Sequence, residues 1–139
     1  MSGKWEEYET DLFKKNIKSG DIILDIGAHI GYYTLIAAKI VGNKGKVYAF
    51  EPDPKNFQIL KRNTEENKYK NVVLVNKALS NKSGSIKLFL NKENTGDHRI
   101  YDSADNRKSI NIQAITLDDF FKDKAKKVDL IKMDVQGAE

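Results

Sequence analysis

The chain has 139 residues and a mass of 15.8 kDa, and its 24 lysine and arginine residues against 20 aspartate and glutamate residues give it a net charge of +4. Because the sequence contains no cysteine, disulfide bonds, thiolate metal ligands and cysteine nucleophiles are excluded. Charges of both signs are scattered and no apolar stretch is long enough to span a bilayer, so we expect a single cytoplasmic domain over residues 1–139 that binds neither a membrane nor nucleic acid.

Apolar residues near the start of the chain recur at spacings of three and four positions. They are Trp5, Tyr8, Leu12, Phe13 and Ile17. This spacing predicts an amphipathic helix whose apolar side covers one face of a sheet.

The next segment predicts a strand, a tight turn and a helix. The apolar run Ile22–Leu24 ends in Asp25, a turn containing Gly27 and Gly31 follows, and Tyr32–Val41 has the period of a helix. Glycine suits a turn in which the backbone bends sharply and lies close to a ligand, because a Cβ would obstruct both. The start of the helix presents unpaired N–H groups to a carboxylate or phosphate. This order is typical of the first βα unit of a nucleotide-binding sheet.

A second strand and helix follow in the same order. Lys46–Phe50 is the predicted strand, and Glu51 stands directly after it. Asp53 and Pro54 suit the cap and the first position of a helix that runs to about Asn67. The alternation of strand and helix indicates an α/β fold with a mostly parallel sheet.

The regular alternation breaks after the third predicted strand, Val72–Val75. Apolar and polar residues alternate in Ser85–Leu90 and again in Ser109–Ile115, on either side of the polar loop Asn91–Lys108. Period-two patterning on both sides of a loop predicts an antiparallel strand pair inserted after strand three. The loop is the candidate substrate-facing insertion.

The last part of the chain predicts a short helix and a fourth strand of the main sheet. Thr116 and Asp119 have the spacing of a capping box, and Val128–Met133 is the fourth strand. An apolar strand suited to the interior of a sheet is a poor edge, because its free side pairs readily with other chains. We therefore expect either a chain truncated after strand four or a homo-oligomer that completes the edge with a partner copy.

The glycine spacing distinguishes two kinds of nucleotide site. The dinucleotide fingerprint has glycine at the first, third and sixth positions of the turn, whereas His29 and Tyr32 stand at the last two of these positions here. The pattern that is present, Asp-x-Gly-x-x-x-Gly from Asp25 to Gly31, resembles motif I of the class I S-adenosylmethionine-dependent methyltransferases. The longer string Leu24–Thr34 resembles their FkbM-type family in particular, which usually has asparagine where His29 stands.

Two further strings resemble the same family. The segment Phe50–Pro52 is similar to its strand-two motif, and Asp129–Glu139 is similar to its strand-four signature, with Gln136 where the family generally has glutamate. The resemblance implies a Rossmann-like, doubly wound, mostly parallel sheet of the class I methyltransferase type, here C-terminally incomplete.

The resemblance also implies S-adenosylmethionine as the cofactor. Asp25 would receive the ammonium group of the cofactor. Glu51 would accept hydrogen bonds from its ribose hydroxyls, since it lies 51 − 27 = 24 positions after Gly27, close to the roughly 20-residue offset of such acids. The backbone around Ala78 would line the adenine, although Lys77 stands where many related enzymes have an acid. The predicted cofactor-binding residues are Asp25, Gly27, Ala28, His29, Gly31, Tyr32, Glu51, Pro52 and Ala78.

Asp134, after the fourth strand, is the predicted catalytic residue, facing the methyl end of the cofactor and the acceptor. It could orient the substrate, act as a general base or bind a metal. Orientation is favoured, because alignment of reacting groups contributes about 7–11 kcal/mol, whereas general-base catalysis contributes about 10²–10⁴-fold. We expect no metal, because no second acid or histidine near Asp134 has ligand spacing.

The family resemblance favours O-methylation of a hydroxyl group on a small molecule or sugar. The alternative is a truncated, non-catalytic domain that binds the cofactor and lacks the acceptor pocket. A nucleic-acid-binding domain ranks last, since it rests on the basic isoelectric point of about 9.1 alone.

Overall fold

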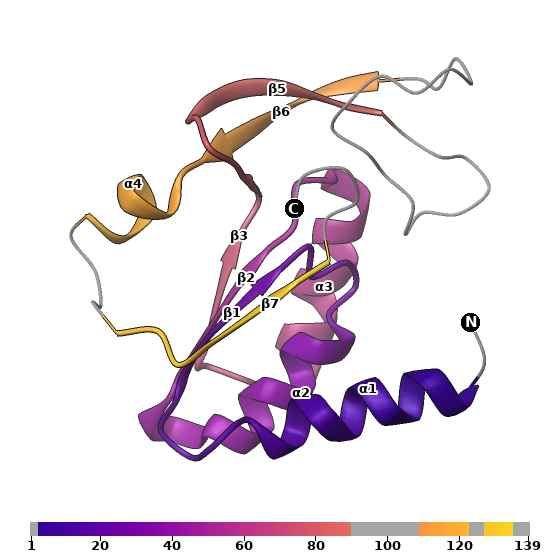
Figure 1. The fold of residues 1–139 in the computed structure, drawn as a ribbon. Helices are drawn as coiled ribbons and strands as arrows, with labels where there is room; N and C mark the ends of the chain where they lie inside the picture. Colours follow the sequence, from indigo (N-terminus) through magenta and orange to yellow (C-terminus); the bar gives the residue numbers. More distant parts are fainter. Residues whose placement is uncertain (1–2, 90–108, 123–126, 135–139) are drawn as a thin grey trace.

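The computed structural model describes residues 3–89, 109–122 and 127–134, without the side chains of residues 3–6. In this part of the chain, four parallel strands form the main sheet in the order β3-β2-β1-β7 (Figure 1). Their bounds are Ile22–Ile26 for β1, Lys46–Phe50 for β2, Val72–Val75 for β3 and Leu130–Met133 for β7. The predicted parallel sheet and its four strands are confirmed, with β7 at one edge of the described sheet.

Three helices cover one face of the main sheet (Figure 1). They are α1 (Gly3–Lys15), α2 (Tyr32–Val41), which continues into the short 3₁₀ helix η1 (Gly42–Lys44), and α3 (Pro54–Glu66). The helices α1 and α2 pack on β1 and β2 through the buried residues Phe13, Ile17, Ile23, Ala37, Ala38, Val41 and Val47. Helices form where the sequence predicts all three, but the predicted apolar side of α1 is confirmed only in part. Phe13 is buried, whereas Tyr8 and Leu12 are 60% and 48% exposed, Ile17 is buried beyond the end of the helix, and the side chain of Trp5 lies outside the description.

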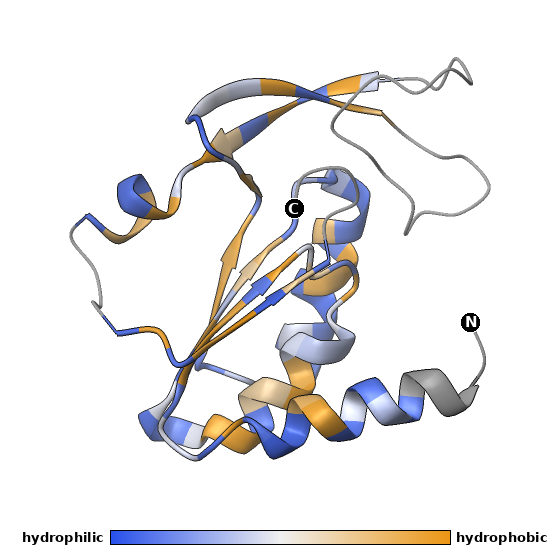
Figure 2. Ribbon diagram, viewed as in Figure 1, coloured by the Kyte–Doolittle hydropathy of each residue, from blue (hydrophilic) through white to orange (hydrophobic). Residues whose placement is uncertain are grey.

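Alternation along β1 decides which side chains reach the helices. Ile23 belongs to the core beneath α1 and α2. Since successive side chains of a strand point to opposite faces, Asp25 points to the same face as Ile23, toward the start of α2. The main sheet is hydrophobic over most of its length, and hydrophilic residues interrupt it near the carboxyl ends of β1 and β7 (Figure 2).

The short helix α4 (Leu117–Phe121) covers the opposite face of the main sheet. Its residue Phe120 is buried and meets Phe50 and Tyr48 edge-on, with ring centroids 4.9 Å and 5.4 Å away respectively. Aromatic pairs of this geometry contribute about 0.5–1.5 kcal/mol beyond the burial of their area. These contacts hold the end of β2, directly before Glu51.

A second, three-stranded sheet lies beyond the carboxyl ends of the main strands (Figure 1). Its strands are β4 (Ala78–Leu79), β6 (Ser109–Ile115) and β5 (Gly84–Phe89), in that order. The antiparallel pairing of β5 with β6 confirms the predicted inserted strand pair. Strand β4, which pairs parallel with β6, was not predicted, because a two-residue strand shows no period. The loop Asn91–Lys108 lies outside the described residues.

The predicted capping box at the start of α4 forms only in part. Thr116 is the N-cap, and its hydroxyl accepts a hydrogen bond of 3.0 Å from the Asp119 N–H. The Thr116 N–H donates instead to Oγ of Ser83, at 3.1 Å, and the Ser83 hydroxyl donates to the Asp119 carboxylate. Ser83 thus stands between the two groups that a full capping box would join directly.

The last residue that the structure describes is Asp134. Gln136 and the rest of the strand-four signature after Asp134 lie outside the described residues. The helices of the described part of the chain include none that is long and apolar enough to cross a membrane.

Candidate cofactor site

The turn between β1 and α2 is held by hydrogen bonds to its neighbours. The N–H groups of Gly27 and Ala28 both donate to the carbonyl oxygen of Phe50, each at 2.9 Å. On the other side, the side-chain amide of Asn63 in α3 donates to the carbonyl oxygen of Ile30 at 2.7 Å. These bonds fix the turn at the carboxyl end of β1, where ligands bind in open α/β sheets.

The conformation of the turn explains its residue types. Gly27, His29 and Gly31 have φ angles of 75°, 55° and 105°, in the region that side chains rarely adopt. A Cβ at Gly31 would also lie 2.8 Å from Cδ1 of Leu60, so glycine is needed there for space as well as for conformation. Asparagine and histidine are both enriched among non-glycine residues with positive φ. Histidine at position 29 is therefore compatible with the backbone of this turn.

Asp25 is a buried carboxylic acid at the carboxyl end of β1. Its side chain is only 2% exposed and accepts a hydrogen bond of 2.6 Å from the hydroxyl of Thr34, in the first turn of α2. Burial disfavours the charged form and raises the pKa of Asp25 to about 6, against the opposing effects of the Thr34 hydrogen bond and the positive charge of Lys132. Asp134 adds a smaller contribution that raises the pKa further.

Glu51 lies on the other side of the same turn. It is 3% exposed and accepts hydrogen bonds from the N–H groups of His29, at 2.8 Å, and Asp53, at 2.9 Å. Burial raises the pKa of Glu51 to about 7 although both hydrogen bonds lower it, and the negative charges of Asp53 and Asp25 raise it further. The Asn76 amide holds the backbone here, donating to the carbonyl oxygen of Glu51 at 2.8 Å. In this structure Glu51 braces the turn.

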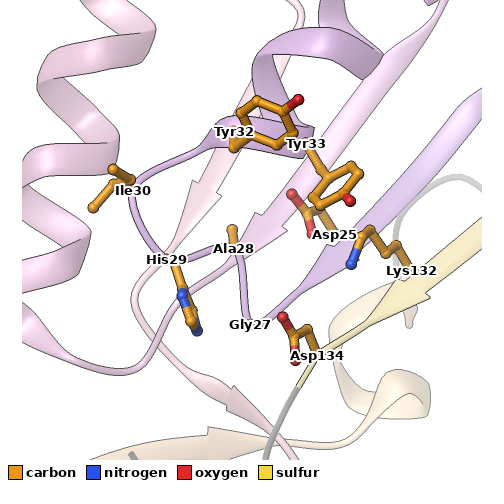
Figure 3. Close-up of a pocket in the computed structure, with 9 residues that line it drawn as sticks. All are labelled: Asp25, Gly27, Ala28, His29, Ile30, Tyr32, Tyr33, Lys132 and Asp134. Carbon is orange, nitrogen blue, oxygen red and sulfur yellow. The ribbon is translucent and has the colours of Figure 1, made fainter. Parts of the chain in front are cut away.

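A hollow of about 170 Å³ opens beside Asp25. It is lined by Asp25, Gly27, Ala28, His29, Ile30, Tyr32, Tyr33, Lys132 and Asp134 (Figure 3). Its walls come from the turn, from the first residues of α2 and from β7 with the residue that follows it. The Asp134 N–H donates to the carbonyl oxygen of Ile26 at 3.0 Å, which holds the end of β7 beside β1.

Six of the predicted cofactor-binding and catalytic residues line this hollow. They are Asp25, Gly27, Ala28, His29, Tyr32 and Asp134. Gly31, in the turn, and Glu51, which accepts from the His29 N–H, are not among the residues that line the hollow, and buried Pro52 accepts a bond from the Asn76 amide at 3.2 Å. Ala78 lies in β4, in the core of the small sheet with Leu88, Ile112 and Ala114. The proposed contact of its backbone with adenine stays a prediction.

Three residues that line the hollow, Ile30, Tyr33 and Lys132, were not among the predicted site residues, and neither was Thr34. Thr34 holds the Asp25 carboxyl group, and Lys132 brings a positive charge to it. The position of Lys132, two residues before Asp134 in a strand, was an available signal, because residues i and i+2 of a strand share a face. No comparable signal singles out Thr34. Within the described ranges, no three histidine, cysteine, aspartate or glutamate residues gather where they could hold a metal ion.

A hollow at the carboxyl ends of parallel strands, beside a glycine turn and a buried acid, defines a nucleotide-cofactor-binding domain of the doubly wound α/β class. Residues 25–139 match the model of the methyltransferase FkbM domain, and the chain belongs to that family. This confirms the expected class, the S-adenosylmethionine-dependent methyltransferases.

Relatives of known description support the same class. A probable cobalt-precorrin-6B C(15)-methyltransferase of Saccharolobus solfataricus is 40% identical over 65 residues, which are 46% of this chain and 33% of that protein. Protein-L-isoaspartate O-methyltransferase 1 of Archaeoglobus fulgidus is 37% identical over 60 residues, 43% of this chain and 28% of that protein. The chain thus spans about a third of the length of these curated relatives.

A solved structure supports the fold. The crystal structure of a Clostridium thermocellum protein described as an rRNA methylase superposes with a TM-score of 0.50 at 23% identity, covering 52% of this chain and 39% of that one. At this level of identity the match concerns the fold alone, and it agrees with the predicted α/β architecture.

Proposed function

We propose that this domain binds S-adenosylmethionine in the hollow beside Asp25 and supports transfer of its methyl group to a hydroxyl group of a small molecule or sugar. The observation that carries the proposal is the buried Asp25 carboxyl group, which lines the hollow at the end of β1 next to the glycine turn. Family membership supports the class of reaction. The choice of oxygen as the acceptor atom rests on the family resemblance.

The residues present suit this cofactor. Asp25 and Asp134 bring two carboxylates to the hollow against the single ammonium group of Lys132, so its charged lining favours a ligand with net positive charge. In S-adenosylmethionine a sulfonium and an ammonium group outweigh one carboxylate. The buried carboxyl group of Asp25 would hold the ammonium group, and the glycine turn leaves space for close approach of the ligand.

The chemistry of the reaction requires alignment above all. When bound, the cofactor supplies a methyl group on a sulfonium, which an acceptor oxygen attacks in line. Asp134 is exposed at the mouth of the hollow, directly after β7. We assign it to orienting the acceptor hydroxyl, because holding two reactants in line contributes about 7–11 kcal/mol to such a step. Glu51 would keep its hydrogen bond to the turn and is the candidate acceptor of hydrogen bonds from the ribose hydroxyls. A carboxylate has acceptor capacity beyond the two bonds that Glu51 receives from backbone N–H groups.

Calorimetric titration with S-adenosylmethionine and, separately, with NAD tests the binding step. We expect S-adenosylmethionine to bind and the Asp25→Ala variant to lose that binding. Binding of NAD alone would show that the hollow serves a dinucleotide instead, and the methyltransferase proposal would fall.

A second candidate is cofactor binding without catalysis. It is favoured by the position of β7, which forms one edge of the main sheet in the described part of the chain, with Ile131 and Met133 each 45% exposed. Formation of S-adenosylhomocysteine in the presence of hydroxyl-bearing acceptors, measured for this chain and for a version extended past Glu139, separates the two. Activity of the extended version alone would favour the second candidate for this chain.

We also propose that the exposed edge of β7 pairs with a second copy of the chain. Light scattering of the purified chain tests this directly. A monomer at all concentrations would rule the pairing out.

A further inference from the structure

Lys132 places an ammonium group in a hollow that is also lined by the carboxyl groups of Asp25 and Asp134. We propose that Lys132 binds the carboxylate of the cofactor's methionine end, while Asp25 binds the ammonium group of the same amino acid. The inference rests on the proposed function and adds to it a residue that discriminates between ligands. It makes Asp25 and Lys132 a pair that recognises both charges of an amino-acid group.

The register of the sheet places these two side chains together. Strands β1 and β7 run parallel, with Asp25 paired to Lys132 and Ile23 paired to Leu130. Paired residues of neighbouring strands project from the same face, and Ile23 and Leu130 both contact the core beneath α1 and α2. Asp25 and Lys132 therefore project toward the start of α2. Each lies two residues closer to the carboxyl end of its strand than Ile23 and Leu130 do.

Tyr33 fixes the direction of the Lys132 side chain. The Lys132 ammonium nitrogen lies 4.1 Å from the centroid of the Tyr33 ring, within the range of a cation–π contact. The ring itself is held edge-on by Phe13 and Tyr32, with centroids 5.0 Å away in each case. In Figure 3 the Asp25 carboxyl group and the Lys132 ammonium group both extend into the space beside this ring.

The size of the hollow fits one end of the ligand. Sites that enclose a whole drug-sized ligand have volumes of roughly 300–1,000 Å³, whereas this hollow has about 170 Å³. It would therefore hold the amino-acid end, between Asp25 and Lys132. Asp134 follows directly after β7, two residues beyond Lys132, and lines the same hollow. This order directs the sulfonium end of the ligand toward Asp134, where the acceptor is proposed to lie.

The competing explanation is that Lys132 only balances the negative charge of Asp25, which would also lower the pKa of Asp25 as the structure indicates. The two explanations differ in which ligands respond to removal of the lysine. A residue that binds the carboxylate matters only for ligands that carry one. A residue that only balances Asp25 affects every ligand whose ammonium group Asp25 binds.

Three ligands test this difference by calorimetry on the full chain. S-adenosylmethionine carries both the ammonium and the carboxylate group, decarboxylated S-adenosylmethionine carries only the ammonium group, and 5′-methylthioadenosine carries neither. In Lys132→Met we expect the affinity for S-adenosylmethionine to fall by roughly tenfold or more, and that for the other two ligands to remain unchanged. Asp25→Asn should lower the affinity for both ligands that carry the ammonium group. Lys61→Met removes an exposed lysine of α3 and should alter none of the three.

The ratio of affinities for S-adenosylmethionine and its decarboxylated form within one variant does not depend on how much of the protein is folded. The same ratio measured in Lys132→Gln repeats the comparison with an uncharged polar side chain in place of the lysine. Equal losses for both ligands in Lys132→Met would overturn the carboxylate assignment while leaving the proposed function intact. Failure of the unmodified chain to bind S-adenosylmethionine at all would overturn the proposed function itself.

Discussion

Two polar clusters at strand ends both contain hydrogen-bonded carboxyl groups, but the pKa values of these groups shift in opposite directions. At the tips of β1 and β2, Asp25 and Glu51 are buried and hydrogen-bonded, and burial raises the pKa of each, to about 6 and about 7. At the start of α4, Asp119 is exposed and accepts a hydrogen bond from Ser83. The hydrogen bonds from Ser83 and Thr116 lower its pKa.

Solvent access, rather than hydrogen bonding, decides the difference. All three carboxylates accept hydrogen bonds, and in each case these bonds lower the pKa. Only where the group is removed from water does the loss of hydration exceed that effect. The cluster at α4 therefore supports the fold, whereas the cluster at the turn weakens it at neutral pH. Buried charges that weaken a fold are typical of sites that bind a charged ligand.

The pH dependence of stability should give the largest effect. Asp25 and Glu51 have pKa values in the folded chain above their ordinary values of 3.8 and 4.5. The folded state therefore holds more protons than the unfolded state between about pH 4 and pH 7, and the free energy of unfolding falls as the pH rises through this window. Each group should contribute a loss of roughly 3 kcal/mol.

Urea unfolding of the cofactor-free chain across this window measures the effect, with the double variant Asp25→Asn, Glu51→Gln as the reference. The difference between the two proteins isolates these groups from the other carboxylates. A difference that stays constant with pH would show that the two acids are ionised normally in the folded chain.

The single substitution Asp25→Asn should separate stability from binding. The amide keeps an oxygen that can accept the Thr34 hydrogen bond but carries no charge, so the variant should be more stable than the unmodified chain above pH 7, by up to roughly 3 kcal/mol. The variant should also lose its binding of S-adenosylmethionine, because an amide cannot pair with an ammonium group as a carboxylate does. Thermal unfolding and calorimetry measure the two effects.

Asp11→Asn is the matched control, since Asp11 is an exposed acid on α1. It should change neither the stability nor the binding to a comparable degree. A less stable Asp25→Asn variant at high pH would contradict the view that burial of the charge is costly.

The substitution Glu51→Gln should have a smaller effect on stability. It removes a buried charge, but the amide has one carbonyl oxygen where the carboxylate accepts from both His29 and Asp53. One of these N–H groups would lose its partner, which costs about 1–3 kcal/mol and offsets much of the gain. Urea unfolding above pH 7 should therefore place this variant between the unmodified chain and Asp25→Asn. Greater stability than that of Asp25→Asn would show that the two backbone bonds contribute little.

The sequence was sufficient to predict the elements of the main sheet and the turn of the site. The apolar run ending in Asp25, the glycines of the turn and the period of Tyr32–Val41 are local signals, and the structure forms the predicted strand, turn and helix there. The same holds for Asp53 and Pro54 at the start of α3, where the Asp53 side chain accepts from the Asn56 N–H.

The contacts across the site could not be read from the sequence. Lys132 reaches Asp25 only because β7 pairs with β1 in one particular register, over a separation of more than a hundred residues. Glu51 accepts hydrogen bonds from the N–H groups of His29, in the turn, and of Asp53, at the start of α3, and the first of these bonds depends on the φ angle of 55° at His29. Both features depend on three-dimensional packing rather than on residue spacing.

The substitution Ser83→Ala should give the smallest effect, and it tests the other half of the comparison. It removes the acceptor of the Thr116 N–H and a donor to Asp119, while the Thr116 cap itself remains. Because the cluster is exposed, water replaces the lost partners, and the loss of stability should be smaller than the change in Asp25→Asn and opposite in sign. Urea unfolding above pH 7 measures it, with Ser85→Ala at an exposed position of β5 as the control. A gain in stability would mean that this cluster, like the one at the turn, weakens the fold, and the contrast between buried and exposed carboxylates would then fail.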